Sequence, residues 1–196
     1  MKDHIAHTRK TKETDISLEA VLYGSGVSKI ESGVGFFNHM LEAFSKHSLI
    51  DLTLTCQGDT HIDDHHSVED CGIALGEALK HMLYPLNGVE RFGNARVVMD
   101  EACVACDIDL SHRAFLVFEV GEHYNRGKIG SFDVELVEEF FRAVCFNANI
   151  SAHIVCERGK NLHHITEAMF KAFGVSLRRA LTPNPRISTP STKGVL

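Results

Sequence analysis

The chain has 196 residues, of which 44% are hydrophobic and 23% are charged, and its formal net charge is −6. These values are typical of a globular protein with its own core, and the negative charge argues against nucleic acid or an anionic membrane as the main partner. Met1–Lys10 contains no apolar run, and no stretch approaches the length of a membrane span. The sequence therefore predicts neither a secretory signal nor a transmembrane helix.

The chain has six cysteines, and Cys103 and Cys106 form the one C-x-x-C pattern among them. A zinc ribbon needs a second such pair. On a strand, positions three apart point to opposite faces, which suits neither chelation nor a disulfide. We interpret the cysteines as small core or surface residues and expect a reducing compartment, the cytoplasm.

In chain order, residues 9–23 are predicted to form two short strands, with Glu13 near the turn between them. Apolar residues at helical spacing predict a helix around residues 37–44, and alternation predicts a strand over residues 50–56. A second helix should begin near His65, where Asp63 and Asp64 can cap it.

The second half of the chain repeats these patterns. Strands are expected over residues 96–109 and 113–120, with Glu101 near the matching turn, followed by a helix, a strand and a helix from residue 137 onward. The tail after Leu181 contains three prolines and is predicted to be a loop or an arm.

This internal repeat predicts an α+β fold of two duplicated halves, each a small β-sheet with two helices packed on one face. Because the pattern agrees across a helix, a strand and a second helix, chance is a poor explanation. We expect a first half over residues 1–90, a second half over residues 91–182, and a C-terminal arm over residues 183–196.

Each half carries the pattern H-H-x-x-E at the start of a helix, and the first begins at His65. His65 and Glu69 are four residues apart and share a helix face, so both can bind one ion. His66 is turned about 100° from His65 and should face a different ion. The same holds for the second pattern, which begins at His163. The duplicated motif therefore predicts two metal ions.

The repeat also suggests how the ligands are shared, because His39 and Glu139 occupy equivalent places in the first helix of each half. A pseudo-twofold arrangement gives one ion the ligands His39, His66, His163 and Glu167. It gives the other ion Glu139, His164, His65 and Glu69. Imidazole and carboxylate ligands without thiolate suit manganese, iron or zinc, and an octahedral preference with open positions favours manganese.

The alternative is that these residues are solvent-facing polar groups on amphipathic helices; duplication in register favours the metal site. His47 and His61 either orient ligands or are hydrogen-bonded core histidines. No spacing argument applies to the remaining histidines, which we interpret as ordinary surface or core residues: His4, His7, His81, His112, His123 and His153.

Four segments together resemble the signatures of imidazoleglycerol-phosphate dehydratases: Gly35–Leu41, Gly58–Asp70, His163–Ala168 and Pro190–Leu196. The resemblance runs from about Arg9 to the end of the sequence. With no phosphatase domain before these motifs, the single-function form is expected. Many family members have histidine where this chain has Glu139, and a carboxylate is also a competent ligand.

The resemblance implies a duplicated fold of the ribosomal S5 domain 2 type and two Mn²⁺ ions per active site. It implies a homo-oligomer of twenty-four subunits, with active sites where subunits meet. The implied reaction converts imidazoleglycerol phosphate to imidazoleacetol phosphate and water in L-histidine biosynthesis.

The implied reaction must remove a hydrogen that is not acidic by itself. If both ring nitrogens of the substrate bind metal, the ring becomes imidazolate-like and can expel the neighbouring hydroxyl, which acidifies that hydrogen. A general base must then accept the proton, and Glu13 matches the family's N-terminal glutamate.

The resemblance also indicates the residues that hold the substrate. Arginine and lysine suit a phosphate, and those at the family's phosphate positions here stand beside small hydroxyl residues. The expected substrate-binding residues are Arg91, Arg113, Ser191, Thr192, Lys193, Lys171 and His47.

Two alternative functions also fit the predicted metal ligands. A dinuclear metal hydrolase would release inorganic phosphate, whereas a dehydratase would form a ketone and retain the phosphate. A metal-storage or metal-sensing protein would have no use for Glu13 or for the Ser-Thr-Lys of the tail.

Overall fold

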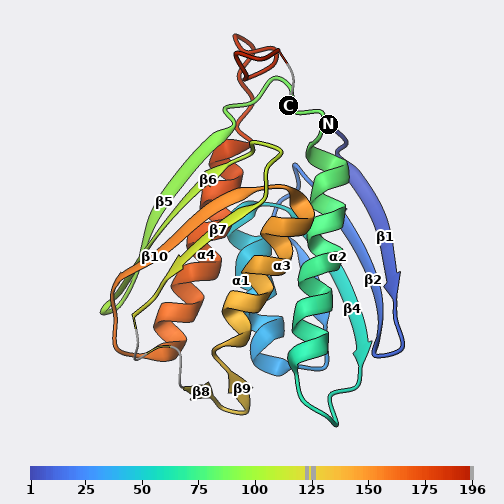
Figure 1. Cartoon of the computed structure of the whole chain (residues 1–196), viewed down its shortest axis with the longest axis vertical. Helices are drawn as coiled ribbons and strands as arrows, with labels where there is room; N and C mark the ends of the chain where they lie inside the picture. The colour runs from blue at the N-terminus through green and yellow to red at the C-terminus, as the bar shows by residue number, and fades with distance from the viewer. Residues whose placement is uncertain (122–123, 125–126, 195–196) are drawn as a thin grey trace.

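The computed structural model describes residues 1–121, 124 and 127–194 (Figure 1). His123, one of the histidines interpreted above, lies outside the described residues, and so do Val195 and Leu196 at the end of the C-terminal motif.

The first half forms a four-stranded sheet in the order β1-β2-β4-β3. Strands β1, β2 and β4 pair in antiparallel fashion, whereas β3 runs parallel to β4. Its elements are β1 (His4–Lys10), β2 (Thr14–Val21), β3 (Ser28–Glu31), α1 (Gly35–Ser48), β4 (Asp51–Gly58) and α2 (His65–Leu83).

The second half repeats this topology in a sheet of order β5-β6-β10-β7, in which β7 runs parallel to β10 and the other pairs are antiparallel. A small β8–β9 hairpin precedes its first helix. Its elements are β5 (Phe92–Met99), β6 (Ala102–Asp109), β7 (Phe115–Glu119), β8 (Lys128–Ile129), β9 (Phe132–Asp133), α3 (Leu136–Ala148), β10 (Ser151–Arg158) and α4 (Leu162–Ala180).

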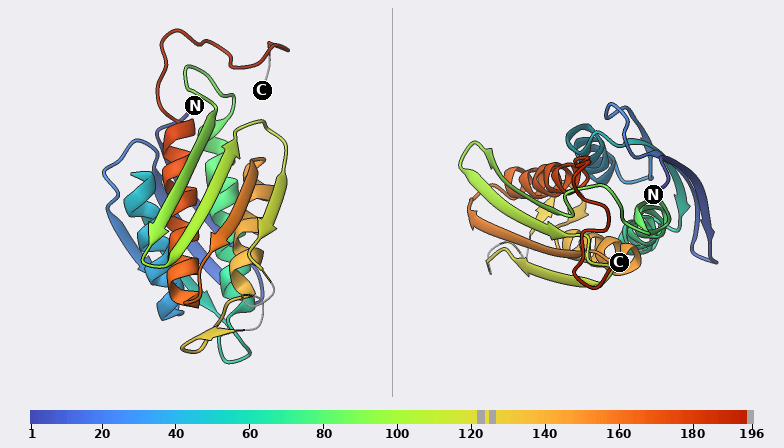
Figure 2. Two further views of the ribbon diagram at one scale, coloured as in Figure 1. Left: turned by 90° about the vertical axis from the view of Figure 1, so that its left-hand side faces the viewer. Right: turned by 90° about the horizontal axis from the view of Figure 1, so that it is seen from above.

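The four helices lie between the two sheets, as the view from above shows (Figure 2). The main helix contacts cross between the halves, because α2 packs against α3 and α1 packs against α4. This architecture confirms the predicted α+β class and places one helix of each half in each pair. The division of the chain at residues 90 and 182 remains a prediction.

Two glycines at equivalent places in the repeat permit these close helix contacts. A Cβ atom on Gly76 of α2 would lie 2.8 Å from the carbonyl oxygen of Val144 on α3, and one on Gly174 of α4 would lie 3.0 Å from that of Phe44 on α1. Any side chain at either position would push the paired helices apart.

The core between the sheets is rich in phenylalanine. Phe37 of α1 contacts Phe140 of α3 at 5.2 Å between ring centroids, and Phe44 of α1 lies 6.1 Å from Phe173 of α4. All four rings are buried. Because these contacts join the halves, the two sheets share one hydrophobic core.

Several local predictions are also confirmed. Glu13 lies in the turn between β1 and β2, Glu101 lies in the turn between β5 and β6, and the cysteines are buried apart from Cys156, which is half-buried. After Leu181, the described tail has no regular element beyond an isolated bridge between Val89 and Pro183.

Among the described residues, no helix is both long and apolar enough to span a bilayer.

Candidate metal centre and substrate site

Three predicted ligands from both halves converge between α1 and α4. Nε2 of His39 lies 3.3 Å from Oε2 of Glu167, and Nε2 of His163 lies 3.1 Å from the same oxygen. One ligand atom from each residue lies within 4.8 Å of the other two. Two imidazole nitrogens and a carboxylate oxygen are donors that a first-row divalent cation accepts, so this donor set fits the predicted metal.

Glu167 is the buried member of this group and is 8% exposed. Its other oxygen, Oε1, accepts a hydrogen bond from Nζ of Lys171 at 2.8 Å. Burial acts to raise the pKa of Glu167, but Lys171 and His39 outweigh it, and the pKa is lowered overall. Burial, then the positive charges of Lys171 and Arg178, lower the pKa of His47. Lys171 therefore contacts the metal group, whereas His47 is near enough to Glu167 and Lys171 for their charges to affect its pKa.

The start of each motif helix is held by a polar side chain. On α4, Oδ1 of Asn161 accepts from the backbone N–H of His163 at 2.9 Å and of His164 at 3.3 Å. On α2, Oδ1 of Asp63 accepts from the N–H of His65 at 2.8 Å, whereas Asp64 makes no side-chain capping bond. The predicted capping by both aspartates is therefore right only for Asp63.

The second predicted group is only partly assembled within one chain. Nε2 of His65 lies 3.6 Å from Oε2 of Glu69 on α2. Glu139 occupies the position on α3 that His39 has on α1, but over the described part of the chain it joins no cluster of three ligand atoms.

The remaining two motif histidines contact carboxylates through Nδ1. His66 Nδ1 lies 3.0 Å from Asp59, and His164 Nδ1 lies 2.7 Å from Oε2 of Glu101. These hydrogen bonds raise the pKa of both rings and hold the pKa of Glu101 at about 2. Neither histidine joins the group around His39.

Glu13, the predicted base, is on the opposite edge of the His66 ring. Its Oε1 lies 3.7 Å from Nε2 of His66, and its side chain is half-exposed. In the second half, Nε2 of His164 lies 3.7 Å from Asp100. Glu13 therefore stands beside the ring nitrogen of His66 that does not contact Asp59.

Two of the predicted phosphate residues, Arg91 and Arg113, lie beside Asp109. Arg91 donates to both oxygens of Asp109, at 2.7 and 3.1 Å, and its Nη1 donates to the carbonyl oxygen of Pro190 at 2.7 Å. Arg113 lies 3.9 Å from Asp109. Oγ of Ser191 accepts from the N–H of Lys193 at 3.2 Å. The structure thus joins Arg91 to the tail that carries Ser191, Thr192 and Lys193.

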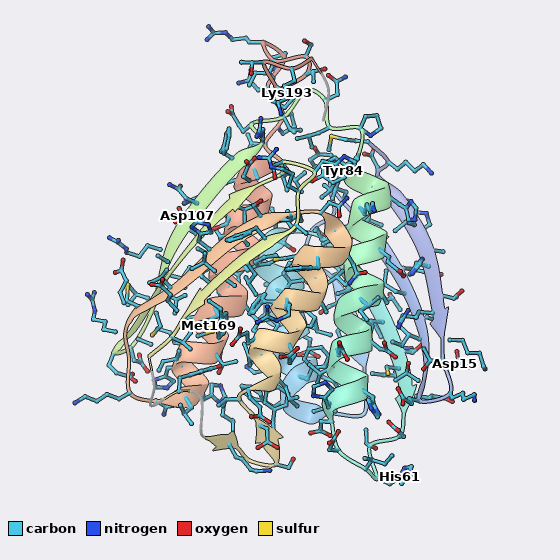
Figure 3. All side chains as sticks on the ribbon, viewed as in Figure 1. Asp15, His61, Tyr84, Asp107, Met169 and Lys193 are labelled. Atoms are coloured by element: carbon cyan, nitrogen blue, oxygen red, sulfur yellow. The ribbon has the colours of Figure 1, made fainter. Side chains whose placement is uncertain are left out.

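This basic group and the metal group lie at opposite ends of the molecule. The N–H of Arg91 donates to the carbonyl oxygen of Ala180, the last residue of α4, whereas His163 lies in the first turn. At a rise of about 1.5 Å per residue, the two ends of α4 are about 25 Å apart. Figure 3 likewise places Lys193 at one end and His61 at the other.

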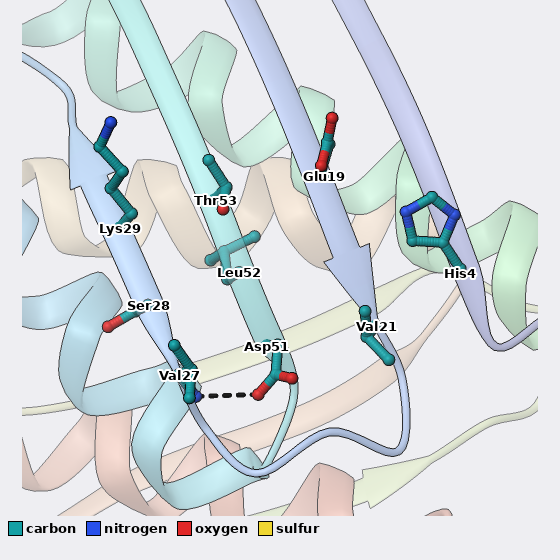
Figure 4. Close-up of a pocket in the computed structure, with 9 residues that line it drawn as sticks. All are labelled: His4, Glu19, Val21, Val27, Ser28, Lys29, Asp51, Leu52 and Thr53. Carbon is teal, nitrogen blue, oxygen red and sulfur yellow. Dashed lines mark hydrogen bonds between the residues drawn. The ribbon is translucent and has the colours of Figure 1, made fainter.

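A surface hollow elsewhere is not connected with these residues. It is on the first sheet (Figure 4) and contains none of the predicted site residues. The N–H of Val27 donates to Asp51 there at 2.9 Å, and that bond shapes the loop before β3.

Three acidic residues of the site were not assigned from the sequence: Asp59, Glu101 and Asp109. Asp59 stands within the first motif segment and Glu101 in the turn equivalent to that of Glu13, so both had a positional signal. Asp109 had no such positional signal in the sequence, because its pairing with Arg91 depends on the path of the chain between α2 and β5.

Fold and site together define a duplicated α+β protein with a candidate metal centre between its halves. The sequence model described as imidazoleglycerol-phosphate dehydratase matches residues 32–177, more than half of the chain. The chain belongs to the imidazoleglycerol-phosphate dehydratase family, whose members are hydro-lyases.

Close relatives agree with this assignment. The chain is 68% identical to the imidazoleglycerol-phosphate dehydratase of Helicobacter hepaticus over 100% of this chain and 97% of that protein. It is 62% identical to that of Campylobacter curvus, over 100% of both.

Solved structures are also similar. The imidazoleglycerol-phosphate dehydratase of Staphylococcus aureus matches with a TM-score of 0.82 and 39% identity, over 92% of this chain and 100% of that one. The enzyme from Pyrococcus furiosus in complex with (S)-C348 matches with a TM-score of 0.81 and 37% identity, over 96% and 99% of the two chains.

Proposed function

We propose that this chain converts imidazoleglycerol phosphate to imidazoleacetol phosphate and water in L-histidine biosynthesis, in the cytoplasm, with two Mn²⁺ ions in each active site. The observation that carries the proposal is the convergence of His39, His163 and Glu167 within 4.8 Å in a member of this family. His65, Glu69 and Glu139 are the equivalent residues for the second ion.

The active site is proposed to form between copies of the chain. About 25 Å separates the ends of α4, which is far longer than a small phosphorylated substrate, so one chain's metal group and phosphate residues cannot hold the same molecule. His66 and His164, which lie outside the metal group of their own chain, complete the ligand sets from other copies. A closed assembly of twenty-four subunits meets this requirement.

His39, His163 and Glu167 would hold one ion, and the ions would supply Lewis acidity to the substrate ring when bound. The chain's own residues then have separate tasks. Glu13 accepts the proton from the second carbon of the substrate side chain; its carboxylate is half-exposed and beside His66, so it can reach a bound molecule. Lys171 keeps Glu167 ionised through their 2.8 Å hydrogen bond.

The phosphate is proposed to bind where Arg91 meets the tail. Asp109 holds the guanidinium of Arg91 through two hydrogen bonds, and Arg91 in turn holds the tail at Pro190. Arg113, Ser191, Thr192 and Lys193 then present cationic and hydroxyl donors to the phosphate oxygens. Lys171 and His47 are proposed to contact the substrate from the metal side.

Product analysis tests this function. Manganese-loaded protein incubated with imidazoleglycerol phosphate should form imidazoleacetol phosphate without releasing inorganic phosphate, and chelation should abolish the reaction. Released phosphate without a ketone would support the hydrolase instead. Full activity in a metal-free preparation would refute the metal-dependent mechanism.

A further inference from the structure

The turn before the second strand of each sheet ends in a glutamate, and the two glutamates differ in their contacts. Glu13 immediately precedes β2 and Glu101 immediately precedes β6. Glu13 lies 3.7 Å from Nε2 of His66, whereas Glu101 lies 2.7 Å from Nδ1 of His164. Equivalent residues of the repeat therefore face opposite edges of equivalent histidines.

Glu101 is held in place by three contacts. Its Oε1 accepts from the backbone N–H of Lys160 at 3.1 Å and of Asn161 at 2.7 Å, and its Oε2 faces His164. An ionised carboxylate can only accept hydrogen bonds, so Nδ1 of His164 must carry the proton in this contact. In the neutral ring, the other nitrogen, Nε2, then has a free lone pair.

In the first half, Asp59 makes the corresponding contact. Both of its oxygens lie within 3.1 Å of Nδ1 of His66. Over the ranges that the structure describes, no backbone N–H donates to the carboxylate of Asp59, so this side chain is freer to rotate than that of Glu101. Glu13 stays on the Nε2 edge, where a base acting on a bound molecule would be needed.

We infer that Glu101 and Asp59 are positioning residues that fix His164 and His66 as the tautomer with the proton on Nδ1, so that Nε2 of each ring is presented to a cation. This inference rests on the proposed function, because it assumes that both rings bind metal. A hydrogen-bonded carboxylate that sets the tautomer of a metal-binding histidine also raises the basicity of that ligand.

The two carboxylates should differ in how they respond to an amide. In Glu101→Gln, the two backbone N–H groups still need an acceptor, so they hold the amide oxygen of the glutamine in the place of Oε1. The NH₂ group of the glutamine then faces Nδ1 of His164. Nδ1 must then accept, the ring proton moves to Nε2, and the metal-binding nitrogen is blocked. In Asp59→Asn, the amide is free to turn its oxygen toward Nδ1, and the tautomer is kept.

The test is a Mn²⁺ titration of the chelator-stripped full-length protein, followed by the electron paramagnetic resonance signal of free Mn²⁺. Glu101→Gln should weaken one of two binding events about ten- to hundredfold and leave the other unchanged. Asp59→Asn should have a smaller effect than Glu101→Gln. The matched control is Glu157→Gln, because Glu157 pairs with Arg96 and not with a histidine.

The outcomes distinguish a failure of this inference from a failure of the proposed function. Unchanged Mn²⁺ binding in Glu101→Gln, with two ions bound to the wild type, overturns this inference and leaves the proposed function standing. A wild type that binds no Mn²⁺ overturns both. If Glu101→Gln does not fold, Asp59→Ala decides, because it removes the acceptor from His66; a binding event weakened about tenfold supports the inference and an unchanged one overturns it.

Discussion

Nε2 of His39 and Oε2 of Glu167 lie 3.3 Å apart although the two residues are 128 positions apart in the chain. The contact exists because α1 of the first half packs against α4 of the second. Neither half contains this donor set alone, so the candidate metal centre depends on the pairing of the two halves.

Replacing Glu13 with glutamine should reduce turnover by about a hundredfold or more, the usual scale for removal of a general base. The amide keeps the shape of the side chain but cannot accept the proton. Folding, metal content and affinity for the substrate should stay near those of the wild type. Steady-state kinetics with metal analysis checks this. Wild-type turnover in Glu13→Gln would mean that another group is the base.

Replacing Glu139 with glutamine should weaken the binding of one Mn²⁺ ion. The ion at His39, His163 and Glu167 should stay bound, because Glu139 is assigned to the other ligand set. Replacement with histidine should preserve binding, since imidazole is also a suitable ligand. Metal content per chain after dialysis measures both. Glu138→Gln is the matched control, because Glu138 pairs with Arg142 on the same helix. Equal metal content in all four proteins would remove Glu139 from the ligand set.

Replacing Lys193 with alanine should raise KM strongly while two metals per chain remain, because Lys193 lies at the end of the molecule opposite His61 and the start of α2 (Figure 3). The loss of one charged contact to a phosphate corresponds to roughly tenfold or more in binding. Arg186→Ala, also in the tail but outside the proposed phosphate group, should behave as wild type. Loss of metal in Lys193→Ala would contradict this assignment.

Mn²⁺ affinity should fall in mildly acidic solution. A histidine must be neutral to bind a cation. Hydrogen bonds to Asp59 and Glu101 raise the pKa of His66 and His164 above the ordinary value of 6.5. A raised pKa keeps the protonated ring populated at higher pH, so the loss of affinity should begin above pH 6.5 and deepen as the pH falls. Titrations between pH 8 and pH 6 check this, and an affinity independent of pH would contradict it.

Much of the fold follows from the sequence because the repeat shows each element twice. The alternation of Leu52 and Leu54, and of Ala152 and Ile154, predicts the strands that the structure contains. Strand β3 was not predicted, because four residues give too little alternation and the strand exists through its parallel pairing with β4. Hydrophobic periodicity alone also does not predict which helices pack against each other.

The site was predicted in part for the same reason. The equivalence of His39 and Glu139 led to a ligand set of which His39, His163 and Glu167 are brought together within one chain. The sequence did not predict that Asp59 and Glu101 contact His66 and His164. Each contact depends on how the loop that carries the carboxylate lies against the first turn of the helix, and periodicity does not show this.

The most direct test of the proposed two-metal site is an anomalous difference map, measured at the manganese absorption edge, from a crystal of the manganese-loaded protein. We expect one peak in contact with His39, His163 and Glu167 and a second in contact with His65, Glu69 and Glu139. Each should be completed by His66 or His164 of a neighbouring copy. A map without a peak between His39 and Glu167 would contradict it.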